Sequence, residues 1–277
     1  MCAASSDVHG RNRLTEAGGI SPPALRDAQD QNPRVGKVFV RLFERFSRRA
    51  RQRRANLFRS AFGLTDGTRI LDLGSEWGGN IRAVLDGTPV KPENTFIADI
   101  NPQVLERGRQ SFGFVPVLVG DSGKLPFPDG YFDIVYCSSV IEHVTIPKDQ
   151  VWTLRSGKVF RQLSREHQRE FAREIQRVGR QFFVQTPYRW FVLESHSWMP
   201  FVAFLPRRLL LPLLKFAAGF WPKSTNPDWC LLDRRELRSM FEGAEIRDEK
   251  WLGLTKSIMA VKTERPLHIM ASPNGDC

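Results

Sequence analysis

The stretch RILDLGSEWGGN, residues 69–80, decides the fold class of this chain. Its apolar residues carry one acid, Asp72, into a glycine-containing turn, and a helical pattern begins at Asn80. Glycine lets a ligand approach the backbone closely, and the first turn of a helix presents unpaired N–H groups with a positive potential. The stretch therefore predicts a strand, a turn and a helix that together bind a polar, nucleotide-like group.

Strand-like and helix-like segments alternate along the rest of the chain. The predicted strands are 69–73, 95–100, 116–119, 132–137, 181–185, 244–251 and 257–262, and the predicted helices between them are 79–86, 102–111, 158–179 and 233–242. This alternation predicts an α/β fold, a Rossmann-like seven-stranded, mostly parallel sheet with helices on both faces. Such sheets bind ligands beyond the carboxyl ends of their strands.

Three acids follow the first three predicted strands. Asp72 ends the first strand, Asp99 nearly ends the second and Asp121 lies just past the third. Each alone could be a loop residue or a helix cap, but the three together predict one ligand site at the same edge of the sheet. An ionised carboxylate only accepts hydrogen bonds, so an acid after the second strand suits the two hydroxyls of a ribose.

Composition and the chain ends set the limits of the predicted domain. The chain has 277 residues, and its four cysteines are scattered without metal-ligand spacing, so we expect a reduced, cytoplasmic protein and no metal site. Residues 1–35 are polar and lack the apolar core of a secretory signal, which predicts a disordered leader. The folded domain is expected over 36–263, followed by a disordered tail over 264–277.

A basic helix is predicted over 36–62. Residues 34–54 hold nine Lys or Arg residues and one acid, Glu44, which is a large share of the net charge of +11. The apolar residues between them recur at helical spacing. This pattern is typical of a helix on an anionic membrane, a nucleic acid or an acidic substrate, and equally of a solvated face on a helix packed against the domain.

The segment VGDSGKLPFPDGYFDIVYCSSVIEHV, residues 119–144, carries a family resemblance. It resembles the corresponding motif of the class I S-adenosylmethionine-dependent methyltransferases, in the type 11 group related to quinone C-methyltransferases. The glycine turn and FIADINPQVLERGR, residues 96–109, are similar to the first and second motifs of that family. The resemblance extends over about residues 60–263 and implies an enzyme that uses S-adenosylmethionine.

The resemblance also implies roles for the glycine turn. Gly74 and Gly78 would let the backbone pass close to the methionine part of the cofactor, and Asp72 would orient the turn and the cofactor's amino group. One position departs from the family, because Glu76 stands where the turn usually has its middle glycine. This departure puts the affinity for the cofactor in question, more than the fold.

Five further cofactor residues follow from the same resemblance. Asp99 would hold the ribose hydroxyls, and Ile100 would pack on the adenine. Asp121 would accept a hydrogen bond from the adenine amine, and the backbone of Ser122 would face the ring. Ser138 would line the methionine end of the site, near the methyl group that is transferred.

Two histidines are candidates for a general base, which methyl transfer needs only where the acceptor loses a proton. His143 belongs to the Glu142-His143 pair after the fourth strand, and His196 lies in the aromatic, polar segment after the fifth. The alternative for His143 is a structural or cofactor-site role, because this pair recurs in relatives with different acceptors. The alternative for His196 is a packed surface loop.

An apolar, cationic insertion is predicted over 187–232. Its core, FVAFLPRRLLLPLLKFAAGFWP (201–222), is interrupted by Arg207, Arg208 and Lys215, and Pro206 and Pro212 are expected to break a helix. Charges near the centre of a membrane span are costly, so the segment does not read as a span. It fits a hairpin on a membrane surface or over an apolar acceptor, or an extra helix packed at the sheet edge.

These observations predict methyl transfer from S-adenosylmethionine to oxygen or carbon of a small or lipidic, isoprenoid-type acceptor, in the cytoplasm and peripheral to a membrane. A nucleic-acid (RNA) methyltransferase is the alternative that the charge raises. Against it, CSSVIEH (137–143) lacks the Asn-Pro-Pro-aromatic run that is used on base amines. A non-catalytic scaffold is the alternative that Glu76 raises.

Overall fold

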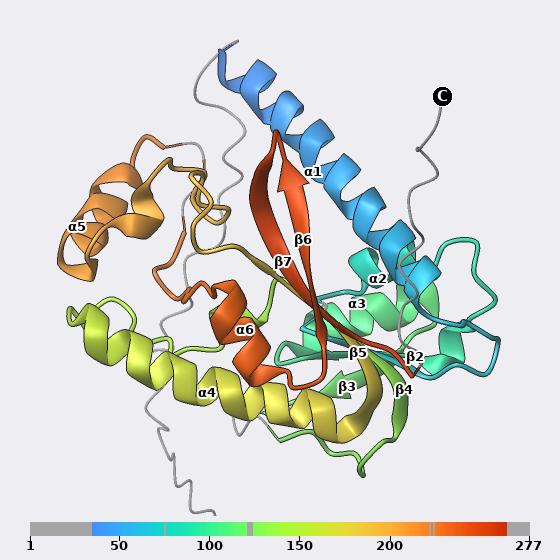
Figure 1. Cartoon of the computed structure of the whole chain (residues 1–277). Helices are drawn as coiled ribbons and strands as arrows, with labels where there is room; N and C mark the ends of the chain where they lie inside the picture. Colours follow the sequence, from blue (N-terminus) through green and yellow to red (C-terminus); the bar gives the residue numbers. More distant parts are fainter. Residues whose placement is uncertain (1–34, 75, 121–123, 222, 224, 265–277) are drawn as a thin grey trace, which may run out of the picture.

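A computed structural model describes residues 35–74, 76–120, 124–221, 223 and 225–264 (Figure 1). The expected leader and tail lie outside these residues, except for positions 35 and 264. The predicted cofactor residues Asp121 and Ser122 also lie outside them.

A seven-stranded sheet in the order β3-β2-β1-β4-β5-β7-β6 forms the centre of the fold. The strands are β1 (Ile70–Leu73), β2 (Thr95–Asp99), β3 (Val115–Leu118), β4 (Phe132–Ser138), β5 (Gly179–Pro187), β6 (Glu245–Trp251) and β7 (Leu254–Lys262). Neighbours from β3 to β5 are parallel, whereas β7 is antiparallel to both β5 and β6. The predicted mostly parallel sheet is confirmed. Its strand order reverses between β1 and β4, where such sheets bind ligands.

Helices cover both faces of the sheet (Figure 1). One layer contains α1 (Val35–Ala61), α2 (Gly79–Val84) and α3 (Pro102–Phe112), and the other contains α4 (Gly157–Val178) and α6 (Arg234–Met240). Alternate residues of β4 fill the two layers, because successive side chains of a strand point to opposite faces. Ile134 and Tyr136 pack in the core beneath α1 and α2, and Val135 and Cys137 pack in the core beneath α4 and α6.

Capping residues explain why several helices begin where they do. Asn101 accepts a hydrogen bond from the backbone N–H of Gln103, and Pro102 follows as the first residue of α3. Asp233 and Glu236 form a capping box at the start of α6. The predicted helices over 102–111 and 233–242 therefore lie close to the observed α3 and α6.

The chain between β5 and α6 contains a short 3-10 helix, η3 (Val202–Phe204), and α5 (Arg207–Ala217). Two other 3-10 helices, η1 (Pro92–Asn94) and η2 (Ile141–His143), precede β2 and follow β4. The expectation that both prolines break a helix is wrong for Pro212, which lies inside α5. Pro206 instead precedes the helix at its amino-terminal cap. α5 loses one internal hydrogen bond at Pro212 and is held by packing of Leu210 and Leu214 in a separate apolar cluster.

One of the cations that interrupt this apolar segment is internal. Arg207 is buried, and its guanidinium donates to the backbone carbonyls of Val151, Leu154 and Pro227. Burial lowers the pKa of Arg207 to about 10. Arg207 therefore attaches α5 to the domain, while Arg208 is exposed. Within the described residues, no helix is long and apolar enough to span a bilayer.

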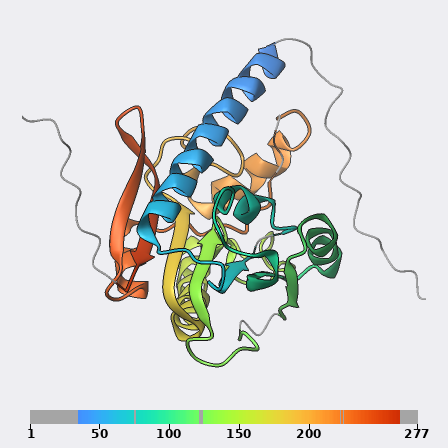
Figure 2. The ribbon, with the colours of Figure 1, turned by 90° about the vertical axis from the view of Figure 1, so that its right-hand side faces the viewer.

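The basic helix is confirmed as α1, which lies across the sheet and extends beyond it (Figure 2). Its carboxyl-terminal half packs through Ala55, Phe58 and Phe62, the last just past the helix end, into the core that it shares with α2. Arg54 of the same half forms an ion pair with Glu249 of β6, at 3.3 Å between Nη1 and Oε2. This half is thus a packed helix, as one of the alternatives predicted.

Candidate active site

A cavity of about 900 Å³ lies at the carboxyl ends of β4 and β5. Side chains of α1, the turn before α2, the end of β4 and the chain after β5 form its walls. The polar wall residues include Ser138, His143 and His196. Three of the predicted site residues therefore line one cavity, at the sheet edge where the sequence placed a ligand.

The glycine turn lies beside this cavity and requires its glycines. Gly74 has a φ of +74°, and a Cβ built there would come within 2.6 Å of the Val140 side chain. Gly78, with a φ of +80°, is the residue before α2. Glu76 has a φ of +53°, a region that costs a non-glycine residue free energy. With Glu76 in place of the family's glycine, the turn is therefore formed but its backbone is strained at this residue.

Asp72 is a buried acid at the end of β1. Its Oδ2 atom has no hydrogen-bond partner among the described residues. Burial, and then the charge of Asp99, raise the pKa of Asp72 well above its usual range. A buried oxygen of this kind is costly unless a donor reaches it, so the position suits a positively charged donor group on a ligand.

Asp99 ends β2 opposite the glycine turn. Its Oδ2 accepts from the backbone N–H of Glu76 and its Oδ1 from that of Asn101, each at 3.0 Å. A carboxylate oxygen has two lone pairs, so each can still accept a ligand hydroxyl. The next residue, Ile100, leaves 63% of its surface exposed at the strand end. The structure thus places an acceptor for hydroxyls beside an uncovered apolar side chain.

The end of β4 is fixed by a residue that the sequence analysis missed. Gln185 of β5 is buried and its Oε1 accepts from both Ser138 Oγ, at 2.7 Å, and Ser139 Oγ, at 3.2 Å. Ser139 has a φ of +61°, so the chain turns sharply there. Position 185 reads in the sequence only as an ordinary strand residue, and the pairing of β4 with β5 gives it this role.

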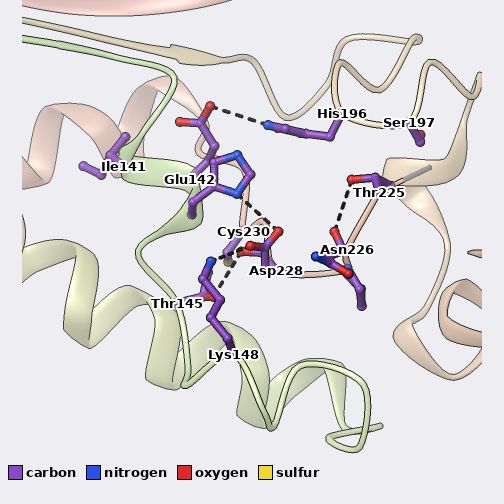
Figure 3. Close-up of polar contacts among 12 residues, drawn as sticks. Ile141, Glu142, Thr145, Lys148, His196, Ser197, Thr225, Asn226, Asp228 and Cys230 are labelled. Carbon is purple, nitrogen blue, oxygen red and sulfur yellow. Dashed lines mark hydrogen bonds and ion pairs between the residues drawn. The ribbon is translucent and has the colours of Figure 1, made fainter. Parts of the chain in front are cut away.

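His143 and His196 come together although they follow different strands. Their ring centroids are 4.5 Å apart and nearly perpendicular. The ring of His196 points toward the carboxylate of Glu142 (Figure 3), with 3.7 Å between Nε2 and Oε1. Burial alone would lower the pKa of His196, but Glu142 and Glu194 outweigh it and raise the pKa to about 9.

Two carboxylates orient these rings from behind. Asp228 Oδ1 lies 3.2 Å from His143 Nδ1, and its other oxygen accepts from Lys148. Glu194 Oε1 lies 2.5 Å from His196 Nδ1. Burial would raise the pKa of Asp228, but its bonds to His143 and Lys148 lower it well below the usual range. The sequence analysis missed Asp228, which lies far from His143 along the chain.

The cavity also has aromatic and cationic walls. Its aromatic residues include Trp77, Tyr188, Phe191 and Trp198, and its cationic residues include Arg48, Arg51 and Lys256. Burial, followed by repulsion from Arg54 and Arg48, lowers the pKa of Arg51, and burial lowers that of Lys256. Part of the basic helix therefore faces this cavity, where an anionic group would relieve the crowded positive charge.

Residues 71–181 match a family model described as "Methyltransferase domain", of type 11. The segment is therefore similar to a methyltransferase domain. The expected resemblance to the methyltransferase family is confirmed for the part of the chain from β1 to the start of β5. The matched segment contains Asp72, Gly74, Asp99 and His143, while His196 and the other residues after β5 lie outside it.

The curated relatives that match the domain are quinone-pathway enzymes. The ubiquinone/menaquinone biosynthesis C-methyltransferase UbiE of Vibrio vulnificus (strain YJ016) is 35% identical over 89 residues, which cover 30% of this chain and 34% of that protein. UbiE of Stutzerimonas stutzeri (strain A1501) is 34% identical over 96 residues, which cover 32% and 37%. The chain thus spans about a third of the length of the curated relatives it matches.

Solved structures of low similarity also match. A SAM-dependent methyltransferase from Aquifex aeolicus aligns with a TM-score of 0.41 and 16% identity, over 75% of this chain and 87% of that chain. The PH0226 protein from Pyrococcus horikoshii OT3 aligns with a TM-score of 0.42 and 14% identity, over 70% and 80%. Both TM-scores are below 0.5, so the assignment of the methyltransferase domain does not depend on them.

Proposed function

We propose that this protein transfers a methyl group from S-adenosylmethionine to oxygen or carbon of a small or lipidic acceptor. The unpartnered, buried Oδ2 of Asp72 carries this proposal, because it lies at the glycine turn of a methyltransferase domain. The cofactor has an ammonium group that can donate to such an oxygen. The chemistry of the residues present therefore fits S-adenosylmethionine.

The remaining cofactor contacts are proposed by position. Asp99 would accept from the ribose hydroxyls and Ile100 would cover the adenine, since one has accepting capacity and the other an uncovered surface. Gly74 and Gly78 would admit the methionine part, and Ser138 would line its far end next to the cavity. The proposed contacts of Asp121 and Ser122 with the adenine fall outside the described residues.

Bound S-adenosylmethionine supplies a methyl group on a sulfonium, which is an activated leaving group. The protein then has to align the acceptor, exclude water and place charge correctly. The aromatic walls of the cavity, among them Tyr188 and Phe191, would pack against the acceptor and exclude water from it. His143 and His196 line the same cavity, so we place both at the acceptor's reacting end.

The acceptor we propose combines an apolar or aromatic body with an anionic group. The aromatic walls support the first part, and the cluster of Arg48, Arg51 and Lys256 supports the second. The matched relatives are named for C-methylation in ubiquinone/menaquinone biosynthesis, which is consistent with an aromatic, lipid-type acceptor. Because α1 directs these arginines to a cavity, the observations favour a small acceptor over RNA.

We also propose that the chain between β5 and α6 is an insertion that touches a membrane surface. Arg207, Leu210 and Leu214 of α5 face the domain. The opposite side exposes a stripe of large apolar residues at helical spacing, Leu209, Leu213 and Phe216, and exposed Phe220 follows in the turn after the helix. Exposed Arg208 and Lys215 accompany this apolar stripe, which is typical of a helix on an anionic membrane.

Calorimetric titration with S-adenosylmethionine and S-adenosylhomocysteine tests the proposed activity at its first step. We expect micromolar binding that Asp99→Ala weakens at least about tenfold, the size of one lost charge-assisted contact. Asp86→Ala is the matched control, because Asp86 is an exposed acid paired with Arg82 and should bind normally. If neither ligand binds the wild-type protein, the cofactor proposal is wrong and a non-catalytic scaffold becomes the better interpretation.

A further inference from the structure

Glu142, His143 and His196 form a cluster that the proposed cofactor site does not use. One ligand atom from each of the three residues lies within 4.8 Å of the other two. We propose that this cluster binds a divalent transition-metal cation beside the acceptor cavity. The inference deepens the proposed function, because it says what the acceptor's reacting end would meet, but the binding of the cation can be measured without it.

One pair of ligand atoms is already close to coordination spacing. His196 Nε2 and Glu142 Oε1 are 3.7 Å apart. Two ligands about 2.1 Å from one tetrahedral ion lie about 3.4 Å from each other. Side-chain rotations that move these two atoms a few tenths of an ångström closer therefore bring this pair to coordination distance.

Glu142 has a buried oxygen that lacks a hydrogen bond and meets only the more distant His196 ring. The side chain is fully buried, and its Oε2 accepts from Thr186 Oγ1 at 3.0 Å. Its Oε1 is buried without a hydrogen bond among the described residues, and it is the atom that faces His196. A buried, unsatisfied carboxylate oxygen is costly, and a cation at this position would satisfy it.

Both histidines are oriented as metal ligands commonly are. A ligating histidine usually bonds through its other ring nitrogen to a carboxylate, which fixes the ring and raises its basicity. His143 Nδ1 meets Asp228 and His196 Nδ1 meets Glu194, so both Nε2 atoms are directed away from these carboxylates. Glu194 is itself held by Ser197, whose backbone N–H and hydroxyl both donate to its Oε2.

The charge balance also favours a cation. Three carboxylates, from Glu142, Glu194 and Asp228, surround two rings, whereas the neighbouring lysines are Lys148, paired with Asp228, and Lys223, which interacts with the charge of Glu194. A divalent ion bound by Glu142, His143 and His196 would balance the remaining negative charge.

The ligand set indicates the class of ion. Two imidazoles and one carboxylate suit Zn²⁺, Fe²⁺, Co²⁺ or Mn²⁺, whereas Mg²⁺ and Ca²⁺ prefer oxygen ligands throughout. Three protein ligands leave coordination positions open, as in catalytic sites. Because His143 and His196 line the acceptor cavity, an open position there would take an oxygen of the acceptor.

Cobalt titration of the full-length protein, stripped of metal with a chelator, tests the site. We expect one Co²⁺ per chain, with the ligand-field absorption of a nitrogen and oxygen site, and displacement by Zn²⁺ but not by millimolar Mg²⁺. Glu142→Gln and His196→Gln should each weaken binding at least about 100-fold. Asp228→Asn should weaken it about 10- to 100-fold, because it removes only the support behind His143.

His167→Gln is the matched control, because His167 lies outside the cluster and its Nδ1 contacts the carbonyl of Thr145 at 2.6 Å. It should bind Co²⁺ as the wild type does. Thermal unfolding of each variant without metal identifies those that fail to fold, and only folded variants are compared. Absence of one-to-one binding, or equal binding by Glu142→Gln, would overturn the proposal.

The two proposals fail separately. If the protein binds cobalt but not S-adenosylmethionine, the metal site is supported and the proposed methyl transfer is contradicted. If it binds S-adenosylmethionine but not cobalt, the metal site is contradicted and the proposed methyl transfer is not.

Discussion

Asp72 is held in surroundings that favour its protonated form. Burial and the neighbouring Asp99 raise its pKa, so the folded protein binds a proton more tightly there than the unfolded chain, whose pKa is about 3.9. Stability without cofactor should therefore fall as pH rises above about 4 and through the raised folded pKa. A ligand cation beside Asp72 would offset this loss.

The variant Asp72→Asn separates the stability of this site from its binding. Without cofactor, we expect the variant to unfold at a temperature equal to or a few degrees above that of the wild type at pH 7, because no charge is buried. Its affinity for S-adenosylmethionine should fall about 10- to 100-fold. Differential scanning fluorimetry and calorimetric titration measure the two effects. A lower melting temperature together with normal affinity would contradict this role.

Gly74 and Gly87 form a natural pair for measuring the crowding in the cofactor turn. Both have positive φ, +74° and +73°, but a Cβ at Gly74 would meet Val140 at 2.6 Å whereas one at Gly87 meets nothing within 4 Å. Gly87→Ala should cost about 1 kcal/mol of unfolding free energy from backbone conformation alone. Gly74→Ala should cost about 1–3 kcal/mol more from overpacking.

Urea unfolding of both variants measures this difference. Val140→Ala combined with Gly74→Ala should recover part of the additional loss, since it removes the methyl groups that the new Cβ would strike. If Gly74→Ala and Gly87→Ala lower the free energy of unfolding equally, the turn tolerates a side chain at Gly74.

At the scale of elements, α5 depends on one buried arginine. Arg207 donates to three backbone carbonyls, and its guanidinium also lies over the Phe160 ring, 3.7 Å from the centroid. Arg207→Met should leave those carbonyls unsatisfied and cost about 2–4 kcal/mol. Hydrogen exchange should then accelerate in α5 more than in the sheet. Arg208→Met, on the exposed side, should change neither quantity.

The sequence predicted elements better than it predicted contacts. Periodicity placed α4 and the strands from β1 to β5 close to their observed positions, because apolar spacing reports which face is buried. It was wrong at Pro212, where tertiary packing of Leu210 and Leu214 outweighs the local cost of proline in a helix. It also gave no sign that Arg207 is buried, since hydropathy does not show which carbonyls a guanidinium can reach.

The same limit applies to the site. The glycine turn, Asp72 and Asp99 could be predicted, because a strand end fixes their position locally. The grouping of Glu142 with His196 could not, because it depends on how the chain after β5 returns to η2. Metal-ligand spacing reveals sites whose ligands follow one another at short, regular intervals in the sequence, which Glu142 and His196 do not, so the expectation of no metal site rested on a signal that this cluster could not give.

At the scale of the whole molecule, two surfaces have to work together if the acceptor is lipidic. One is the acceptor cavity with its aromatic and cationic walls, and the other is the exposed stripe of α5. The cationic wall of the cavity and the α5 stripe belong to α1 or to the chain that follows β5, outside the matched methyltransferase segment, whereas Trp77, Ser138 and His143 of the cavity lie inside it. The shared domain would supply cofactor binding, and these additions would determine which acceptor is methylated and where.

Vesicle binding tests the membrane part of this arrangement. Wild-type protein should sediment with vesicles that contain phosphatidylglycerol, and binding should weaken with added salt because exposed cations contribute to it. The double variant Leu213→Ser with Phe216→Ser removes two exposed apolar side chains from α5 and should reduce the bound fraction at least about tenfold. Leu252→Ser is the matched control, because Leu252 is 81% exposed but lies in the β6–β7 turn.

Equal sedimentation of both variants would locate membrane binding elsewhere, and absence of wild-type sedimentation would leave the α5 stripe without a membrane role. Unchanged S-adenosylmethionine affinity in the double variant would show that the substitutions leave the cofactor site intact.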